Sequence, residues 1–511
     1  MTRRQRHGHQ SWRLTADVSA LSIRGNAVAM TAPSAPPTAE SRLHPGADGR
    51  LGQRRRGALR VSALLLAGLG VLVLLGQRTD PAAALLPSSG PLTIGAVIAL
   101  TGNANLYGQD QRLGLELARR WFNQPLAAPS PAGDGGTRQP LRPVELQLED
   151  GASDEATAIA AFNLLINRGV VALIGPTLSQ QAFAADPIAQ RRGVPVVAPS
   201  NTAQGIPQIG DFISRVSAQS SVIAPLSVAE ALRRDPSIRR VAVFYAQDDA
   251  YSTAETAIFQ RALAERGLTP VTVQRTQLAD NDFQTPITAA LQNRPQLVVI
   301  SAQAVDGGNL IRQLRELGYA GQIVVGNGLN TPNIYPICQR WCDGILIAQA
   351  YSPELSTAVN QAFLRLYHQS HPRQSPSQIT AQAWTAYQVL HQALERLDRR
   401  GALRGLTLAQ ARRALMGELL AGRYDTPLGP IRFQPDGEVV QGRFYVAQVQ
   451  MQPDGRRGRF TLVRDIDLEQ SLPGAPAQRA QAVIAPAGIA PSPIAALASP
   501  PSPMASSRRP Q

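Results

Sequence analysis

The feature that most constrains this fold is a regular alternation of apolar runs and helical segments from residue 92 onward. Strand-like runs lie at residues 92–100, 144–148, 170–174 and 194–198, and helical patterns lie between them at 108–122, from 153 onward and at 180–191. Strands separated by single helices predict parallel crossovers and a doubly wound sheet.

The same alternation then restarts. Strand patterns at 241–246, 271–275, 297–301 and 323–325 alternate with helical patterns at 253–266, 283–292 and 309–317. A strand at 345–350, helices at 361–368 and 380–397, and a strand and hairpin within 427–449 follow. We therefore predict an α/β protein with two doubly wound lobes that exchange segments through several crossings.

The positive charge is concentrated at the ends of the chain. The formal net charge is +14, but residues 1–60 hold eleven Arg and three acidic residues, and residues 471–511 hold three Arg and no acid. The middle is nearly balanced and has no basic stripe interleaved with aromatic residues, so we expect no nucleic-acid binding.

Residues 61–76 form an uncharged apolar run that follows the basic flank Arg54–Arg56. This pattern predicts a signal peptide, or an uncleaved inner-membrane anchor of nearly minimal length. The basic residues 1–60 and the Pro/Ala/Ser-rich residues 471–511 are expected to be disordered.

The two cysteines, Cys338 and Cys342, are four positions apart. In an exported protein this spacing favours a small disulfide loop, with two free buried thiols as the alternative. Two thiols without further ligands cannot complete a structural zinc site, so we expect no metal and no cofactor.

No sequence motif indicates catalysis. The chain lacks a phosphate loop, a Gly-x-Ser-x-Gly elbow and an HExxH motif. His368 and His371 lie where a helix is expected to end before Pro372, and His391 lies within a helix. We expect a binding protein and not an enzyme.

Residues 91–465 resemble the type I periplasmic binding proteins, and within them the leucine/isoleucine/valine-binding family of ABC importers. The stretches that carry the resemblance are 94–102, 106–108 with Gly114, 148–150, 174–176, 194–200, 241–245, 312–318 and 428–430. The resemblance implies two flavodoxin-like lobes joined by three strands, lobe 1 spanning 91–216 plus 348–428 and lobe 2 spanning 217–347 plus 429–465.

The resemblance also implies a function. It indicates an extracytoplasmic, periplasmic solute-binding protein that closes its cleft on an amino acid or related small polar metabolite and delivers it to an ABC permease. A membrane-anchored ligand-sensing receptor with the same fold is the alternative. In either case the ligand is expected at the carboxyl ends of the parallel strands, where loop amides and helix N-termini converge.

Three residues are expected to hold a ligand carboxylate. Ser179 lies between a strand and a helix, where an ordinary helix cap is the alternative interpretation. By similarity to the family, the Ser200 backbone and the Thr202 hydroxyl complete the anion site, and a plain turn is the alternative interpretation.

Four further residues are expected to contact the ligand: Tyr107, Tyr251, Gln303 and Asn327. The sequence departs from the family at Gly328, where relatives that bind free amino acids place a Glu against the ammonium, and at Ser220, which stands at an Asp position. Unless Asp306 or Asp249 replaces that acid, this predicts an amide, a carboxylate or another ligand without an ammonium group.

Overall fold

The protein is described from a computed structural model, which covers residues 81–123 and 142–468. The predicted signal or anchor segment 61–76, the basic residues 1–60 and the tail 471–511 lie outside the described residues. Within the described residues, no helix is long and apolar enough to cross a membrane.

The first sheet has five parallel strands in the order β2-β1-β3-β4-β5. They are β1 (Leu92–Ile98), β2 (Val144–Asp150), β3 (Ala172–Ile174), β4 (Val196–Ala198) and β5 (Ile213–Arg215). The helices that connect β1 to β4 are α2 (Asn105–Phe122), α3 (Glu155–Asn167) and α4 (Ser179–Arg191). This strand order is the flavodoxin-like order, whose switch point lies between β1 and β3.

The second sheet has seven strands in the order β15-β14-β10-β9-β8-β6-β7. They are β6 (Val241–Ala246), β7 (Thr272–Thr276), β8 (Leu297–Ser301), β9 (Gln322–Val325), β10 (Leu346–Gln349), β14 (Arg443–Met451) and β15 (Gly458–Asp467). Strands β6 to β10 are parallel and repeat the order of the first sheet, whereas β14 and β15 are antiparallel additions. The connecting helices are α6 (Ala250–Ala264), α7 (Gln284–Leu291) and α8 (Ala304–Glu316).

The remaining elements are further helices, a small third sheet and short turns. They are α5 (Ser220–Arg234), α9 (Tyr335–Cys338), α10 (Ala358–Ser370), α11 (Gln378–Arg399), α12 (Leu408–Ala421), the small antiparallel sheet β11 (Arg423–Thr426), β12 (Gly429–Phe433) and β13 (Val439–Gln441), and short 3₁₀ turns η1 (Pro81–Ala83), η2 (Pro207–Ile209), η3 (Asn327–Leu329), η4 (Pro332–Ile334) and η5 (Gln339–Cys342). The predicted lobe limits stay a prediction, and strand pairing crosses the limit at residue 428 because β11 and β12 pair across it.

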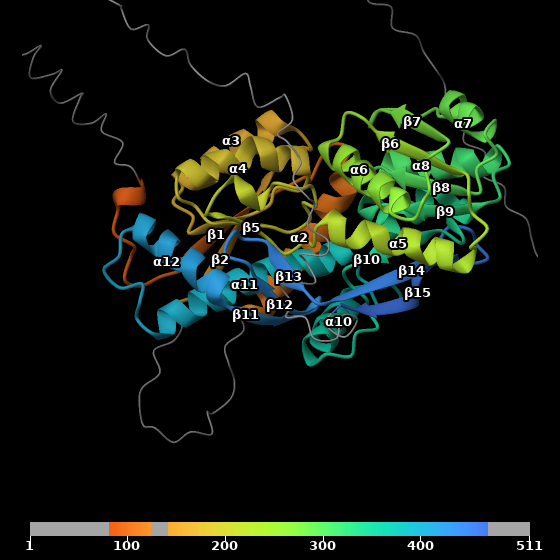
Figure 1. Ribbon diagram of the computed structural model, residues 1–511. Helices are drawn as coiled ribbons and strands as arrows, with labels where there is room; N and C mark the ends of the chain where they lie inside the picture. Colours follow the sequence, from red (N-terminus) through yellow and green to blue (C-terminus); the bar gives the residue numbers. More distant parts are fainter. Residues whose placement is uncertain (1–80, 124–141, 469–511) are drawn as a thin grey trace, which may run out of the picture. The chain divides into compact units, whose positions relative to one another are not determined.

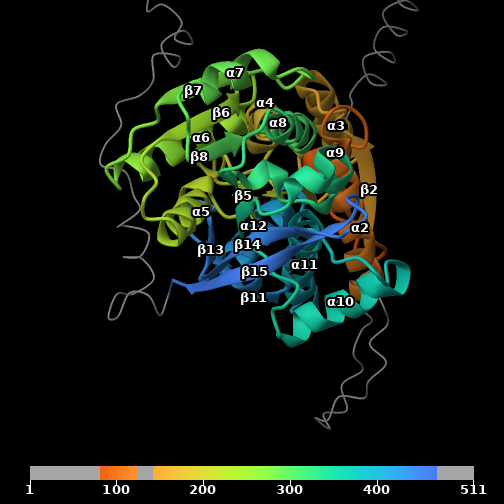
Figure 2. The same ribbon diagram turned by 90° about the vertical axis from the view of Figure 1, so that its right-hand side faces the viewer.

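Each parallel sheet is covered on both faces. Ile94 and Ala96 of β1 pack in the core that contains α2 and α11, whereas Val97 packs in the core that contains α3 and α4. The side chains of a strand point alternately to opposite faces, so a strand buried on both faces reads as an unbroken apolar run. Figures 1 and 2 show these helices on opposite sides of the first sheet. The predicted α/β fold with two doubly wound units is therefore confirmed.

Some elements had no clear signal in the sequence. Helix α5 carries Pro225 in its interior, and β15 carries charged residues on a half-exposed strand. Proline normally argues against a helix interior, and charge argues against a core strand, so tertiary packing decided both elements. The helical pattern expected from residue 153 onward is confirmed as α3, and Asp154 caps its start, because its carboxylate accepts a hydrogen bond from the Thr157 backbone N–H at 2.7 Å.

Candidate ligand-binding site

A cavity brings together all seven residues that the sequence nominated for ligand contact. The space inside it that can hold water-sized groups is about 30 Å³, within a wider hollow of about 330 Å³ that includes open solvent. Its lining comprises Tyr107, Thr177, Leu178, Ser179, Ser200, Thr202, Tyr251, Gln303, Asn327, Gly328 and Ile379. Apart from Ile379, these residues follow the carboxyl ends of β1, β3, β4, β6, β8 and β9, which is where ligands bind in doubly wound sheets. No lining side chain carries a charge.

The polar residues of the lining that follow β3 and β4 form the first-sheet wall: Thr177, Ser179, Ser200 and Thr202. Gln111 of α2 organises part of it, accepting from the Thr177 hydroxyl at 2.6 Å and donating to Ser200 Oγ at 2.8 Å. Ser200 Oγ in turn donates to the Thr177 carbonyl at 2.8 Å. The Ser200 hydroxyl is therefore held by the protein, which leaves its backbone as the group suited to a ligand.

The hydroxyls of Ser179 and Thr202 are not fully used in hydrogen bonds within the protein. Ser179 is the first residue of α4 and not its N-cap, so the alternative interpretation of this serine as the helix cap is wrong. Its Oγ accepts a long hydrogen bond of 3.4 Å from the Ala203 amide, which leaves its proton for another acceptor. Thr202 is buried, and its side chain has no hydrogen-bond partner among residues 81–123 and 142–468. Ser179 lies at the N-terminus of α4, where free amides and the helix dipole favour an anion, and Thr202 lines the same cavity.

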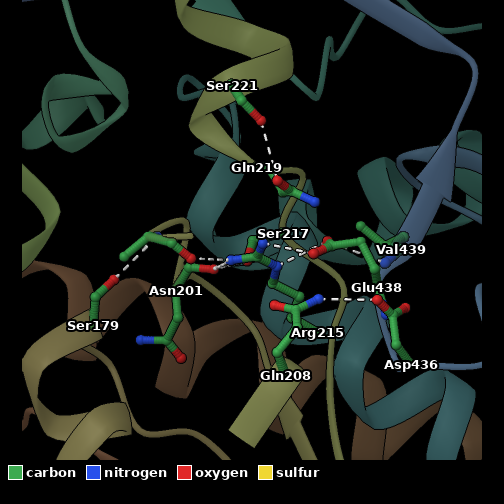
Figure 3. Close-up of polar contacts among 11 residues, drawn as sticks. Ser179, Asn201, Gln208, Arg215, Ser217, Gln219, Ser221, Asp436, Glu438 and Val439 are labelled. Atoms are coloured by element: carbon green, nitrogen blue, oxygen red, sulfur yellow. Dashed lines mark hydrogen bonds and ion pairs between the residues drawn. The ribbon is translucent and has the colours of Figure 1, made fainter. Parts of the chain in front are cut away.

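A buried ion pair supports this wall from behind (Figure 3). Arg215, at the end of β5, pairs with Glu438 at 2.7 Å, and both side chains are almost completely buried. Arg215 Nη1 also donates to the carbonyls of Asn201 and Ala203 at 3.1 and 2.7 Å. These bonds fix the loop that carries Ser200 and Thr202. Sequence reasoning missed the pair because its partners are far apart in the chain.

The residues that follow β6, β8 and β9 form the second-sheet wall: Tyr251, Gln303, Asn327 and Gly328. Glu255, one helical turn after Tyr251 in α6, organises it from outside the cavity. Its carboxylate accepts a hydrogen bond from the Tyr251 hydroxyl and another, at 3.0 Å, from the backbone N–H of Asn327. The Tyr251 oxygen accepts from the Gly328 amide at 2.6 Å. Burial raises the pKa of Glu255 to about 7.

Tyr107 connects the two walls. It lies on α2 after β1, and its hydroxyl donates to the Gly328 carbonyl and accepts from the Ala304 amide at 2.6 Å. Burial raises the pKa of the Tyr107 phenol well above its usual value. The phenol therefore stays neutral and hydrogen-bonded across the cavity.

Two buried acids lie behind the second-sheet wall. Asp249 caps α6 by accepting from the Ser252 backbone N–H at 3.0 Å and also accepts from Gln303 Nε2 at 3.0 Å. Asp306 lies in the first turn of α8, and burial together with the nearby Asp249 raises its pKa well above the usual range. Neither acid lines the cavity.

Asn327 belongs to a buried chain of amide side chains. Its Oδ1 accepts from Gln378 Nε2 at 2.8 Å. Gln378 Oε1 accepts from the Ala350 amide at 2.6 Å and from Asn330 Nδ2 at 2.9 Å. Gln378 is the first residue of α11, and Ala350 directly follows β10. These hydrogen bonds therefore connect the cavity to the segment that follows β10.

The structure explains why position 328 is glycine. A Cβ on Gly328 would lie 2.2 Å from the Ala302 carbonyl oxygen and 2.9 Å from the Tyr251 ring. A glutamate cannot occupy this site without moving backbone. An acid close to the position is Glu255, which bonds the neighbouring Asn327 backbone N–H. Sequence reasoning missed it, although the four-residue spacing from Tyr251 on one helix was an available signal.

The described residues contain no cluster of three or more His, Cys, Asp or Glu side chains placed to hold a metal ion. The cavity instead offers hydroxyls, amides and a helix N-terminus. Such a site is suited to holding a small polar molecule by hydrogen bonds.

Comparisons with known proteins agree with this geometry. The family described as periplasmic binding protein matches residues 91–456. Leu/Ile/Val-binding protein homolog 3 of Brucella melitensis is 23% identical over 310 residues, which cover 60% of this chain and 79% of the relative.

Solved structures share the fold. The leucine-binding protein LivK of Thermotoga maritima has a TM-score of 0.64 and 24% identity, covering 74% of this chain and 99% of that protein. A solute-binding protein of an ABC transporter from Rhodopseudomonas palustris, in complex with 3,4-dihydroxybenzoic acid, has a TM-score of 0.63 and 18% identity, covering 74% and 97%. The family match covers most of the chain and the doubly wound sheets surround a polar cavity, so this protein belongs to the periplasmic binding protein family and has the type I fold.

Proposed function

We propose that this protein is the periplasmic solute-binding component of an ABC importer and that it closes on a small metabolite with a carboxylate group. The observation that carries the proposal is the first-sheet wall, where the Ser179 hydroxyl at the N-terminus of α4 and the Thr202 hydroxyl line a cavity without charged side chains. Helix N-termini and spare hydroxyls bind carboxylates without needing a cationic side chain.

The names of the relatives limit the class of ligand. The curated relatives are named for leucine, isoleucine and valine, and several structural neighbours were solved with aromatic acids such as benzoate and 3,4-dihydroxybenzoic acid. All of these molecules carry a carboxylate. We therefore assign the carboxylate to the first-sheet wall and the variable part of the ligand to the second-sheet wall.

Each nominated residue then has a role. Ser179 and Thr202 donate hydroxyl protons to the carboxylate, and the Ser200 backbone supports it. Tyr107 and Tyr251 form the sides of the cavity, while Gln303 and Asn327 offer uncharged polar groups. An ABC permease is the partner to which the closed form delivers the ligand.

The test is a ligand screen on the purified full chain. Melting temperature is measured against amino acids, aromatic carboxylates, short aliphatic carboxylates and neutral sugars. Selective binding at a hundredfold excess over Kd stabilises the folded state by about 2.7 kcal/mol, so a hit gives a clear shift. We expect hits among carboxylates and none among neutral sugars.

Matched serine variants locate the binding site. Ser179→Ala is expected to weaken the hit about tenfold, because a hydrogen bond to a charged group is lost. Ser370→Ala, on the exposed end of α10, is the control and should bind as the parent does. A sugar hit, or a carboxylate hit unaffected by Ser179→Ala, would overturn the proposed site.

A further inference from the structure

The hydrogen-bond polarity of Gln303 is fixed by its surroundings. Its Nε2 donates to Asp249 Oδ2, an oxygen that already accepts from the amide and the hydroxyl of Ser252. That oxygen therefore faces Gln303 as an acceptor, and the amide cannot be flipped without opposing two acceptors. In the described part of the chain Gln303 Oε1 has no partner, so Gln303 presents an acceptor to the cavity.

The polarity of Asn327 is fixed in the opposite sense. The backbone amide of Ala350 can only donate, so Gln378 Oε1, which it contacts, is the carbonyl end of that side chain. Gln378 Nε2 must then be the donor to Asn327, whose facing atom is Oδ1. The remaining group, Asn327 Nδ2, has no acceptor within the described residues. Asn327 thus presents a donor to the cavity.

The other polar side chains of this half of the cavity are already engaged. The Tyr251 hydroxyl donates to Glu255 and accepts from the Gly328 amide. The Tyr107 hydroxyl donates to the Gly328 carbonyl and accepts from the Ala304 amide. An acceptor from Gln303 and a donor from Asn327 are what remain for a ligand.

From this pairing we infer that the ligand carries, where an amino acid has its ammonium, an uncharged group that both donates and accepts a hydrogen bond, such as a hydroxyl. The inference rests on the proposed function and narrows its ligand class. A hydroxyl donates to Gln303 Oε1 and accepts from Asn327 Nδ2. An ammonium has no lone pair for Asn327 Nδ2, and it would be buried among uncharged side chains.

The rival interpretation uses the buried acids Asp249 and Asp306. Each has one carboxyl oxygen without a hydrogen-bond partner in the described residues, Oδ1 of Asp249 and Oδ2 of Asp306. If one of them were the counter-ion of a ligand ammonium, free amino acids would bind. Gln303 lies between Asp249 and the cavity through its hydrogen bond, and neither acid lines the cavity.

A series of ligands with one carbon skeleton decides between these interpretations. Leucine, 2-hydroxy-4-methylpentanoate and 4-methylpentanoate differ at carbon 2, which carries an ammonium, a hydroxyl or a hydrogen. We expect the hydroxy acid to bind to the full chain about tenfold or more tightly than either of the others, as measured by calorimetry. Binding of leucine at least as tight as that of the hydroxy acid would overturn the inference and leave the proposed function standing. Binding of none of the three, with sugars preferred in the screen, would instead remove the proposed function.

An isosteric variant tests the role of Asn327. Asn327→Asp keeps an acceptor toward Gln378 and replaces the donor at the cavity by a charged acceptor. We expect the Kd ratio of leucine to hydroxy acid to fall about tenfold or more. Asn293→Asp adds the same charge at an exposed site after α7 and should leave the ratio unchanged. An unchanged ratio in Asn327→Asp, with the melting temperature of the parent, would also overturn the inference. Asp306→Asn is the converse test, since only the rival interpretation predicts a selective loss of leucine binding.

Discussion

The two walls of the cavity are held in place by different chemistry. Behind the first-sheet wall, the charges of Arg215 and Glu438 compensate each other at 2.7 Å, and Arg215 also binds the carbonyls of the ligand loop. Behind the second-sheet wall, Glu255 is held by hydroxyl and backbone N–H donors and has no cationic partner among residues 81–123 and 142–468.

Because of this difference, we expect the first-sheet wall to be rigid and the second-sheet wall to be sensitive to pH. In a buried ion pair each charge stabilises the charged form of the other, and removal of one partner leaves the other charge uncompensated. A buried carboxyl without a cationic partner prefers its neutral form. We infer that the first-sheet wall supplies a fixed anion site and that the second-sheet wall responds to protonation. Four predictions test this comparison.

The largest expected effect comes from breaking the ion pair. Glu438→Gln leaves the Arg215 guanidinium buried without a counter-charge and should lower the free energy of unfolding by about 3–5 kcal/mol. Chemical denaturation measures this loss. The control is Glu116→Gln, which breaks an exposed ion pair with Arg112 and should cost at most about 1 kcal/mol. Equal losses in the two variants would show that the buried pair is not the support of the wall.

The second prediction concerns pH. The pKa of Glu255 is about 7 in the folded protein and 4.5 ordinarily, so the folded state holds this proton more tightly. Its contribution is fully present below pH 4.5 and is lost as pH rises through 7, up to about 3 kcal/mol. Denaturation at pH 5 and pH 7.5 should show this loss.

Asp110 has its pKa raised to about 6 by burial and titrates in the same interval, so a variant is needed to isolate Glu255. Glu255→Gln should lose less stability between pH 5 and pH 7.5 than the parent, and the exposed Glu265→Gln should lose as much as the parent. An identical pH slope in Glu255→Gln and the parent would assign the titration to other groups.

Third, the close packing at Gly328 can be tested directly. Gly328→Ala places a Cβ against the Ala302 carbonyl and should destabilise the fold by about 1–3 kcal/mol. Gly417→Ala, in α12 with no atom within 4 Å of the new Cβ, should stabilise by up to about 1 kcal/mol. Gly328→Glu should destabilise at least as much as Gly328→Ala and should not create leucine binding. Leucine binding by this variant would show that the loop yields easily.

The smallest expected effect concerns Cys338 and Cys342, in the segment after the second-sheet wall. Their Cα atoms are 5.4 Å apart, within the range for a disulfide, and both residues are buried. We propose that they form a disulfide in the periplasm. A loop this short should contribute about 2 kcal/mol, seen as a loss of stability on reduction. The double variant with alanine at both positions should be insensitive to reductant, and a parent equally insensitive would contradict the disulfide.

Much of the fold was accessible from the sequence. Unbroken apolar runs such as Val241–Ala246 predicted strands buried on both faces, and helical patterns such as residues 253–266 predicted the helices between them. These signals are local, because hydrophobic periodicity and capping act over a few residues. The same local signals did not indicate α5, which carries a proline in its interior.

The sequence predicted which residues line the candidate site but not the hydrogen bonds that join them. Ser179, Gln303 and Asn327 each follow a strand, and doubly wound sheets bring such positions to one edge, so their types and places were predictable. Their roles in ligand contact stay a proposal.

What the sequence determined by itself is the pair of α/β units and the set of polar loops at their strand ends. Only the tertiary structure decided that Arg215 meets Glu438, that Gln378 turns Asn327 to present a donor, and that Gly328 has no room for a side chain. Each of these depends on contact between segments distant in the chain. The free energy of a buried charge or amide depends on which atoms surround it, and chain order alone does not specify those atoms.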